Sequence, residues 1–459
     1  MNVNFSVIYL SIIFITSCAQ NEEKINDLFK NPQDATNEVR VIGAQVYNLE
    51  YNFSPDHIDN DPPGYTTKDE AVAVEILPDE SILVAGNMAI PDNGNESRDV
   101  YIAKFTPEGE LDTNFADNGY YKFDRDNFDG AGDIVYSGGA IYLVFESRSN
   151  ATSDSSQLAV TKMDTDGTID TDFGTAGTLY IDVGDKKADA KRAFAASDGI
   201  YALAVGGINA TSKRNTFIYK ILSTGSLDST FAGDGELKLA VESDSQSSFG
   251  VYDTIKTDSA GNIFVGGTRW NGTSSRYDAY VAKIQANGTV DTTFADNGYY
   301  FRGTTTYDYL EDFVISQNYL YLPIPRWKND FSGYITHLIR LDVNTGAVDT
   351  SFNNGSGEVV FDGYYYGRSD ILDNKILLSG AIINPSDAAE WSHSYIKLNL
   401  DGSVDTPYGT NGVFERKEYS KLNSIRDLRV SSEGYSVGVG HMLNEELNDQ
   451  VIFIQKLSF

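Results

Sequence analysis

The sequence predicts an all-β fold, a seven-bladed β-propeller in which an N-terminal strand closes the last blade. The first observation is a phrase, Gly-x-aliphatic-Asp-x-x-aromatic, which occurs six times and begins at Gly109, Gly167, Gly225, Gly288, Gly346 and Gly402. The second is that short apolar or alternating stretches, bounded by Gly, Asn and Asp, recur in the same order around every phrase. Such stretches indicate strands and turns, and four antiparallel strands per repeat form a propeller blade. The third is that apolar stretches at the two ends of the chain supply one further blade.

The first repeat shows the elements in order. Residues 71–76 alternate and predict the first strand, a turn follows at 78–80, and residues 82–86 predict an apolar second strand that ends in Gly. A variable polar loop leads to a third strand at 101–105. The phrase then turns the chain, and a short fourth strand at 120–123 ends the unit. No stretch carries a helical periodicity.

The C-terminal tail supplies three strands of a seventh blade, at residues 425–430, 435–440 and 451–457. Its fourth strand is expected from the apolar sequence within residues 39–53. That strand would close the ring non-covalently and leave no exposed sheet edge.

The phrase itself has a structural interpretation. Its Gly supplies the positive φ of a tight turn, and its aliphatic residue packs inward. Its Asp accepts hydrogen bonds from backbone amides of the same turn, and its aromatic ring fills the wedge between neighbouring blades. A chemical role for the six Asp residues is disfavoured, because a residue present in every blade belongs to the scaffold.

Residues 78–86 (Pro-Asp-Glu-Ser-Ile-Leu-Val-Ala-Gly) and the pair Phe173-Gly174 resemble the delta-60 repeat family of bacterial proteins. Units of that family carry the phrases Gly-x-Leu-Asp-x-x-Phe-Gly and Pro-Asp-Gly-Lys-Ile-Leu-Val-Ala-Gly. The resemblance covers residues 70–415 and, more weakly, the seventh blade; Ala or Asn often replaces the Gly after Phe, and Tyr408 replaces Phe in the last phrase. It implies a propeller and an exported bacterial protein, and it implies no catalytic residue.

The N-terminus predicts export. An apolar run at residues 7–15 has the length of a signal-peptide core, and Ile15-Thr16-Ser17-Cys18 resembles the bacterial lipobox, with Cys18 as the lipidation site and the chain's one cysteine. We expect a lipoprotein signal peptide at 1–17, a lipidated cysteine and flexible tether at 18–38, and the propeller at 39–459. The protein would be lipid-anchored in the outer membrane, facing the periplasm or the cell surface. The start of the chain has no Lys or Arg, so an ordinary secretory signal remains the alternative.

The net charge and the spacing of the histidines narrow the classes of partner and cofactor that are expected. The formal net charge of −31 disfavours nucleic acid, and it leaves the lipid anchor as the expected contact with membrane. His57, His337, His393 and His441 are scattered over different repeats without ligand spacing, so no metal and no cofactor are expected. No catalytic residue is assigned, and a monomer is expected.

One sector of one face is rich in aromatic and Arg residues. The loops between strands two and three, and the connections between blades, emerge on this face; in blades four to six they carry large rings, whereas the loops of blades two and three are Ser, Thr and Asn. Such a sector indicates a binding patch, although rings that only pack over loop bases are the alternative. The candidate binding residues are Trp270, Trp327, Trp391, Tyr307, Tyr309, Tyr365, Arg269, Arg326 and Arg368.

Two functions remain open, with a purely structural envelope role as a third. The leading interpretation is a non-enzymatic lipoprotein whose propeller binds an extracellular protein, peptide or glycan. The alternative is a propeller enzyme acting on polysaccharide, a lyase or glycosidase, that uses carboxylates or Tyr and Arg groups on the aromatic face. Propellers serve both classes, so the fold alone does not decide.

Overall fold

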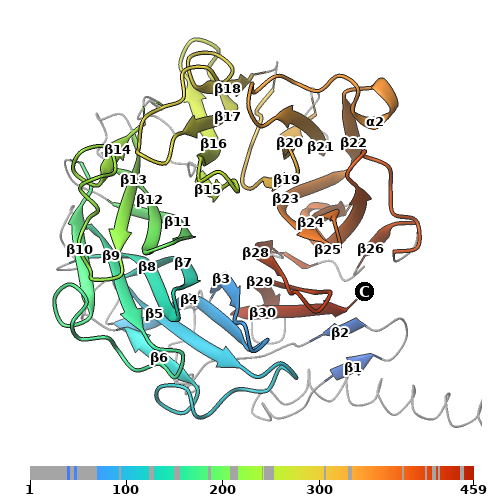
Figure 1. Ribbon diagram of the computed structural model, residues 1–459. Helices are drawn as coiled ribbons and strands as arrows, with labels where there is room; N and C mark the ends of the chain where they lie inside the picture. The colour runs from blue at the N-terminus through green and yellow to red at the C-terminus, as the bar shows by residue number, and fades with distance from the viewer. Residues whose placement is uncertain are drawn as a thin grey trace, which may run out of the picture.

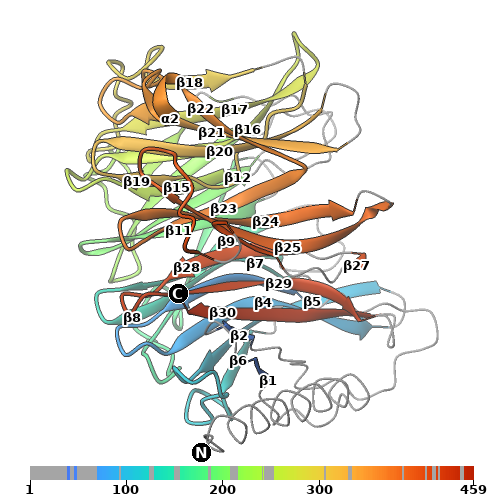
Figure 2. The ribbon, with the colours of Figure 1, turned by 90° about the vertical axis from the view of Figure 1, so that its right-hand side faces the viewer.

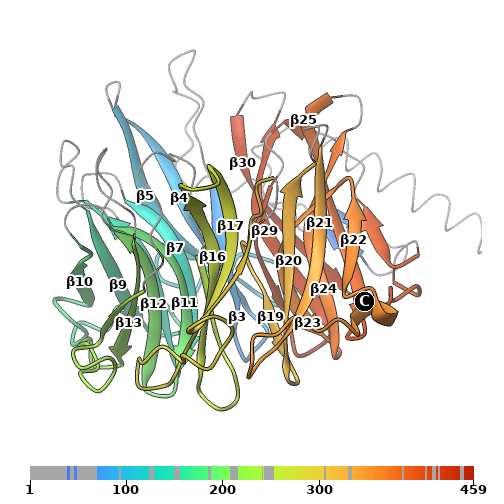
Figure 3. The ribbon, with the colours of Figure 1, turned by 90° about the horizontal axis from the view of Figure 1, so that it is seen from above.

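The computed structural model shows a ring of seven β-sheets around a central axis (Figure 1). It describes residues 39–41, 46–48 and 70–458, apart from 93–94, 124–128, 149–155, 185–187, 207–214, 240, 242–252, 304–305, 329–332, 385–386, 409–410, 416–419, 422–423 and 445–448. The predicted signal peptide, Cys18 and the tether lie outside the described residues. The strands run roughly along the ring axis (Figures 2 and 3). The prediction of a seven-bladed propeller is confirmed.

Each blade is an antiparallel sheet whose strands follow the chain from the axis outward. Blade one is β3 (Glu70–Ile76), β4 (Ile82–Asp92), β5 (Asn95–Phe105) and β6 (Tyr120–Phe123). Blade two is β7 (Gly130–Ser137), β8 (Ala140–Ser147), β9 (Gln157–Met163) and β10 (Thr178–Asp182). Blade three is β11 (Asp189–Ala196), β12 (Gly199–Gly206), β13 (Asn215–Leu222) and β14 (Glu236–Lys238).

Blades four to six continue this order. Blade four is β15 (Asp253–Thr257), β16 (Ile263–Asn271), β17 (Arg276–Ile284) and β18 (Tyr299–Arg302). Blade five is β19 (Val314–Ser316), β20 (Tyr319–Trp327), β21 (Tyr334–Asp342) and β22 (Glu358–Asp362), with one short helical turn, α2 (Phe352–Gly355). Blade six is β23 (Tyr364–Leu372), β24 (Lys375–Asn384), β25 (Asp387–Asn399) and β26 (Val413–Glu415), and β27 (Ser420–Lys421) also pairs with β25. No helix in the described part of the chain has the length and apolarity needed to cross a bilayer.

The seventh blade joins the two ends of the chain, as predicted. Its strands are β28 (Ser424–Val430), β29 (Tyr435–Asn444) and β30 (Asp449–Ser458). The N-terminal strand β2 (Val46–Asn48) pairs antiparallel with β30, and β1 (Val39–Val41) pairs with β2 on the outside. The ring is therefore closed by backbone hydrogen bonds between segments far apart in sequence.

The phrase aromatics lie between neighbouring blades, which confirms their predicted role. Phe173 is buried at 1% exposure and packs edge-to-face on Tyr142 of blade two, within a cluster that also contains Ile200 and Tyr219 of blade three. Phe231 occupies the same place between blades three and four. Because each blade buries its faces against its neighbours, the core is a series of seven interfaces, here called seams.

The phrase aspartates stabilise their own turns. The Oδ1 of Asp228 accepts the backbone amide of Thr230 at 2.9 Å, and its Oδ2 lies 2.5 Å from the Nζ of Lys220 on the third strand. Hydrogen bonds from Lys220 and Thr230 lower the pKa of Asp228 to about 2. The pair recurs as Lys162 with Asp170 at 2.7 Å. The basic partner was not predicted, although a Lys or Arg recurs eight or nine residues before each Asp of the phrase.

Candidate functional site at the axial mouth

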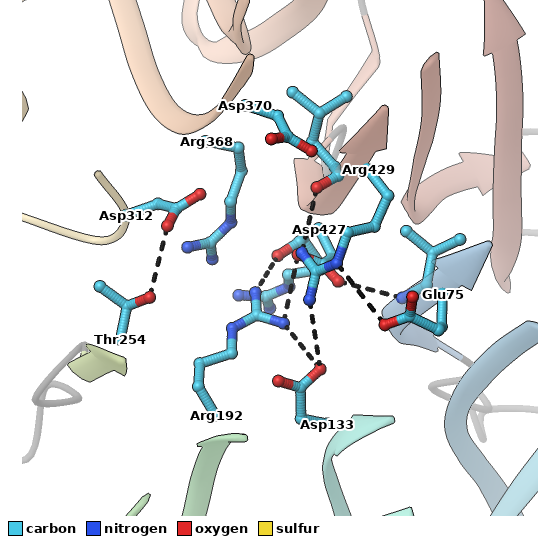
Figure 4. Close-up of polar contacts among 12 residues, drawn as sticks. Glu75, Asp133, Arg192, Thr254, Asp312, Arg368, Asp370, Asp427 and Arg429 are labelled. Atoms are coloured by element: carbon cyan, nitrogen blue, oxygen red, sulfur yellow. Dashed lines mark hydrogen bonds and ion pairs between the residues drawn. The ribbon is translucent and has the colours of Figure 1, made fainter. Parts of the chain in front are cut away.

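Charged side chains from the innermost strands fill the axis of the ring (Figure 4). Arg192 of β11 lies 3.5 Å from Asp133 of β7 and 3.3 Å from Asp427 of β28. Arg429 of β28 lies 3.0 Å from Asp427 and 3.9 Å from Asp133. Both carboxylates are almost completely buried. Taking charges out of water is costly unless they are paired, and here every charge has opposite neighbours.

The axial aspartates also bond the blades to one another. Asp133, Asp312 and Asp427 each accept a backbone amide of the next blade's innermost strand, at 2.8 to 3.1 Å; the donors are Ala193, Ser369 and Val74. Thr254 and Lys256 of blade four approach Asp312 at 3.3 and 3.2 Å. This network is a structural plug, because its carboxylates are already occupied by the scaffold.

Burial and pairing set the proton affinities in the plug. Burial raises the pKa of Asp133, whereas at Asp427 the guanidinium groups of Arg192 and Arg429 outweigh burial and lower the pKa. Burial raises the pKa of Glu75, on β3, to about 7.

A second polar group joins the innermost strand of blade six to the residues directly before β19 of blade five. Arg368 of β23 forms an ion pair with Glu311, with 3.3 Å between its Nη2 and the Oε2 of Glu311, and its Nη1 donates to the Glu311 carbonyl at 3.0 Å. The Tyr365 hydroxyl donates a short hydrogen bond to Oε1 of the same carboxylate. Glu311 and Arg368 are 8% and 7% exposed, and Tyr365 is half-buried. We call Glu311, Tyr365 and Arg368 the mouth triad.

Two glycines make room for the mouth triad. A β-bulge in β23 falls at Gly367, and a Cβ there would lie 2.6 Å from Oε2 of Glu311. A Cβ at Gly380 on β24 would clash with the carbonyl oxygen of Tyr365. The absence of side chains at these positions lets the first strand carry Tyr365 and Arg368 close to Glu311.

Tyr365 is also part of an aromatic cluster in the seam between blades five and six. Ring centroids are 4.9 Å apart for Tyr334 and Tyr365, 4.1 Å for Trp327 and Tyr334, and 5.7 Å for Tyr334 and Trp391. Trp391 lies 5.8 Å from Tyr365. The indole rings of Trp327 and Trp391 are half-exposed. We call these four residues the main cluster.

A similar cluster occupies the seam between blades four and five. Trp270 and Tyr277 are 5.1 Å apart, and Tyr277 lies 5.7 Å from both Tyr307 and Tyr309. The guanidinium of Arg276 lies 5.7 Å over the ring of Tyr307. We call Trp270, Tyr277, Tyr307 and Tyr309 the adjacent cluster.

The structure brings most of the predicted binding residues together on one face. The three Trp, the three Tyr and Arg368 belong to the two clusters or the mouth triad. The tryptophans lie in strands β16, β20 and β25 rather than in loops, because these hairpins continue pairing through Trp270 with Tyr277 and Trp327 with Tyr334. That the face binds a ligand stays a prediction.

Two predicted arginines lie elsewhere. Arg269 stacks 3.6 Å over Phe301 and lies 3.7 Å from Asp278, within its own blade. Arg326 neighbours Trp327 on β20, and side chains alternate along a strand, so it points to the opposite face of the blade. Adjacent residues of a strand point to opposite faces and cannot line one patch. This constraint does not apply to loops, in which these residues were predicted to lie.

Sequence reasoning missed Glu311, Tyr277 and Tyr334. A signal for the tyrosines existed, because Tyr277, Tyr334 and Trp391 precede the basic residue of the third strand by the same spacing in blades four, five and six. No sequence pattern marked Glu311, because its partners Tyr365 and Arg368 are brought to it by the bulge in β23 of another blade. In the part of the chain that the structure describes, no three His, Cys, Asp or Glu residues are grouped to hold a metal ion.

Comparisons with known proteins support the fold. A family model described as "Domain of unknown function (DUF5122) beta-propeller" matches residues 77–115 and 261–294. Among curated proteins, nothing matches this sequence. The solved structure of polysaccharide lyase Uly1 is similar with a TM-score of 0.50 and 11% identity, over 93% of this chain and 95% of that chain. The α-L-arabinofuranosidase Arb93A from Fusarium graminearum has a TM-score of 0.41 and 9% identity, over 91% and 98%. At such identities the likeness to Uly1 establishes the fold; the delta-60 family itself stays a prediction.

These comparisons correct the leading interpretation of the sequence, a non-enzymatic propeller that binds an extracellular partner. The solved structure that matches across most of the ring with a TM-score of 0.50 is named as a polysaccharide lyase, which agrees better with the alternative of an enzyme. The non-enzymatic interpretation relied on the lack of catalytic motifs. A site assembled from several blades would leave no local motif, so that lack is no argument against an enzyme.

Proposed function

We propose that this propeller is an enzyme that cleaves polysaccharide by β-elimination, as a lyase. The observation that carries the proposal is the position of Tyr365. Its ring belongs to the main cluster, and its hydroxyl donates to the buried carboxylate of Glu311. A sugar stacked on the half-exposed indoles would therefore lie beside a group able to transfer a proton. The fold likeness to lyase Uly1 is in keeping with this proposal, but a fold alone selects no reaction.

The mouth triad can move protons in the way that elimination requires. The Tyr365 oxygen takes the proton from C5 of a uronate unit while its own proton passes to the Glu311 carboxylate. The C4–C5 double bond forms, the C4–O bond breaks, and the leaving oxygen takes a proton from Tyr365, which regains one from Glu311. Arg368 is a positioning residue, because it contacts Glu311 and holds its carboxylate in place.

Hydrolysis by paired carboxylates fits these groups less well. Glycosidases place two carboxyl groups about 5 to 10 Å apart across the scissile bond. The axial carboxylates are buried in the plug, and the Glu311 carboxylate is held by Arg368 and Tyr365. Elimination instead needs a group that exchanges protons next to the bound sugar, which Tyr365 provides.

The overall charge bears on how an acidic polymer would approach. A net charge of −31 repels a uronate chain at long range. At physiological ionic strength this repulsion is screened beyond about 8 Å, so the contacts at the face decide whether the chain binds.

A screen of polysaccharides tests the function. Wild-type protein is incubated with pectate, alginate, hyaluronan, ulvan and neutral xylan, and both reducing ends and the ultraviolet absorbance of the new double bond are measured. We expect both signals on a uronate polymer, and a loss of at least about 100-fold in Tyr365→Phe, since general acid–base groups contribute about 10² to 10⁴. The matched control is Tyr364→Phe, whose hydroxyl donates at 2.7 Å to Glu415. Reducing ends without absorbance, or full activity in Tyr365→Phe, would contradict the proposal.

We also propose that the enzyme is an exported lipoprotein anchored through Cys18 in the outer membrane. The support is the apolar run at 7–15 followed by a lipobox-like sequence. Cys18→Ser should remove the acyl acceptor and leave the precursor unprocessed, or move the protein to the soluble fraction. Fractionation of cells that express each form measures this; unchanged partitioning and processing would favour an ordinary secretory signal.

A further inference from the structure

The main cluster is repeated one blade away. Trp327 and Tyr334 face each other at the ends of β20 and β21, and Trp270 and Tyr277 do so at the ends of β16 and β17. Tyr365 packs on Tyr334 from the first strand of the following blade, and Tyr309 packs on Tyr277 from the start of its following blade. Two neighbouring seams therefore present the same three rings.

This repetition is not required by the scaffold. At the places of Trp270 and Tyr277, blade two has Arg148 and Ser156, and its paired strands end at Ser147 and Gln157. The five phenylalanines of the phrase are fully buried, whereas Trp270, Tyr307 and Tyr309 are half-exposed. Paired large rings at the hairpin ends of blades four and five, where blade two has Arg and Ser, indicate a surface for a ligand.

The two clusters are held rigidly side by side. The backbone amide of Tyr309 donates to the carbonyl of Pro325 at 2.9 Å, and Asp308 forms a β-bridge with Arg326, directly before Trp327. On the other side, the Asp308 amide donates to the Tyr277 carbonyl at 3.0 Å. One short segment thus links the end of β20 to the start of β17, so the spacing between the clusters is fixed.

We infer that the adjacent cluster is a second sugar-binding subsite, occupied by a remote part of the same polysaccharide chain that is cleaved at the mouth triad. This inference rests on the proposed function. The chain would cross the top of blade five, from the main cluster to the adjacent cluster, and stack a sugar ring on Trp270. Flat rings with few rotatable bonds supply stacking area at a small entropic cost. The subsite would promote the cleavage only of chains long enough to contact both seams.

Oligosaccharides of graded length test the subsite. They are prepared from the polysaccharide that the wild-type protein cleaves in the screen, and kcat/KM is measured against length. In the wild type we expect kcat/KM to rise with length until both seams are spanned. Trp270→Ala should lower kcat/KM about tenfold on the long chains and much less on the short ones, which flattens the dependence. Trp327→Ala should lower it at every length.

Controls separate the subsite from the fold and from the proposed function. Tyr307→Ala is a second variant in the adjacent cluster in case Trp270→Ala folds poorly, and Arg148→Ala tests the same repeat position in blade two. Retardation of the same variants in gels that contain each polysaccharide reports binding without cleavage. Cleavage with an unchanged length dependence in Trp270→Ala and Tyr307→Ala overturns the subsite alone. No cleavage and no retardation on any polymer overturns both proposals.

Discussion

At the scale of single residues, His441 is expected to make folding sensitive to acid. Burial, together with the charge of Arg426, lowers the pKa of His441 to about 4, from an ordinary value of 6.5. The folded protein therefore keeps this ring neutral in a pH range where the unfolded chain binds a proton. The stability it contributes is complete above pH 6.5 and is lost as the pH falls towards 4, by at most about 3 kcal/mol. Chemical denaturation at pH 7, 5.5 and 4.5 should show a smaller decline in His441→Gln than in the wild type; parallel declines would refute this.

At the scale of elements, the bulge in β23 links local geometry to the mouth triad. Gly367→Ala would place a methyl group 2.6 Å from Oε2 of Glu311 and 3.1 Å from the Tyr365 ring, so these groups must separate. We expect at least tenfold lower cleavage with a small loss of stability. Gly132→Ala is the matched control, because it occupies the bulge of β7 and would meet Ala190 instead. It should lower the melting temperature and leave cleavage intact. Equal cleavage by the two variants would show that the bulge does not position the triad.

At the scale of the whole molecule, the ring depends on its closing strand. A chain that begins at residue 54 lacks β1 and β2, and it exposes the edge of β30 where Val46 and Tyr47 pair with Leu457 and Lys456. We expect its melting temperature to fall by several degrees and its tendency to aggregate to rise, while a chain that begins at residue 39 melts like the full protein. Calorimetry and light scattering measure both. The same melting temperature for the two truncations would mean that the pairing contributes nothing to stability.

The sequence sufficed for the blades because six of the seven carry the same local turn chemistry. The roles of Gly167, Asp170 and Phe173 can be predicted from a single repeat, because these residues contact only their own turn and seam. Glu311 could not be predicted, because its partners Tyr365 and Arg368 come from another blade and meet it through a bulge. The contacts of Arg269 could not be predicted either, because the face to which its side chain points depends on how far the two strands of the hairpin stay paired. Local sequence patterns thus predict the scaffold, whereas the mouth triad depends on how neighbouring blades are positioned relative to one another.

The ion pairs on the axis have a consequence for heating. The hydration of charged groups becomes less favourable as temperature rises, so the cost of keeping Arg192, Arg429 and their aspartates away from water falls. Hydrophobic stabilisation per unit area levels off over the same range. On warming, the ion pairs at the axis therefore contribute a larger share of the ring's stability, and the apolar seams contribute a smaller share. The first parts to loosen should be the outer strands, far from the axis, and the innermost strands should stay bonded to one another until the whole ring opens.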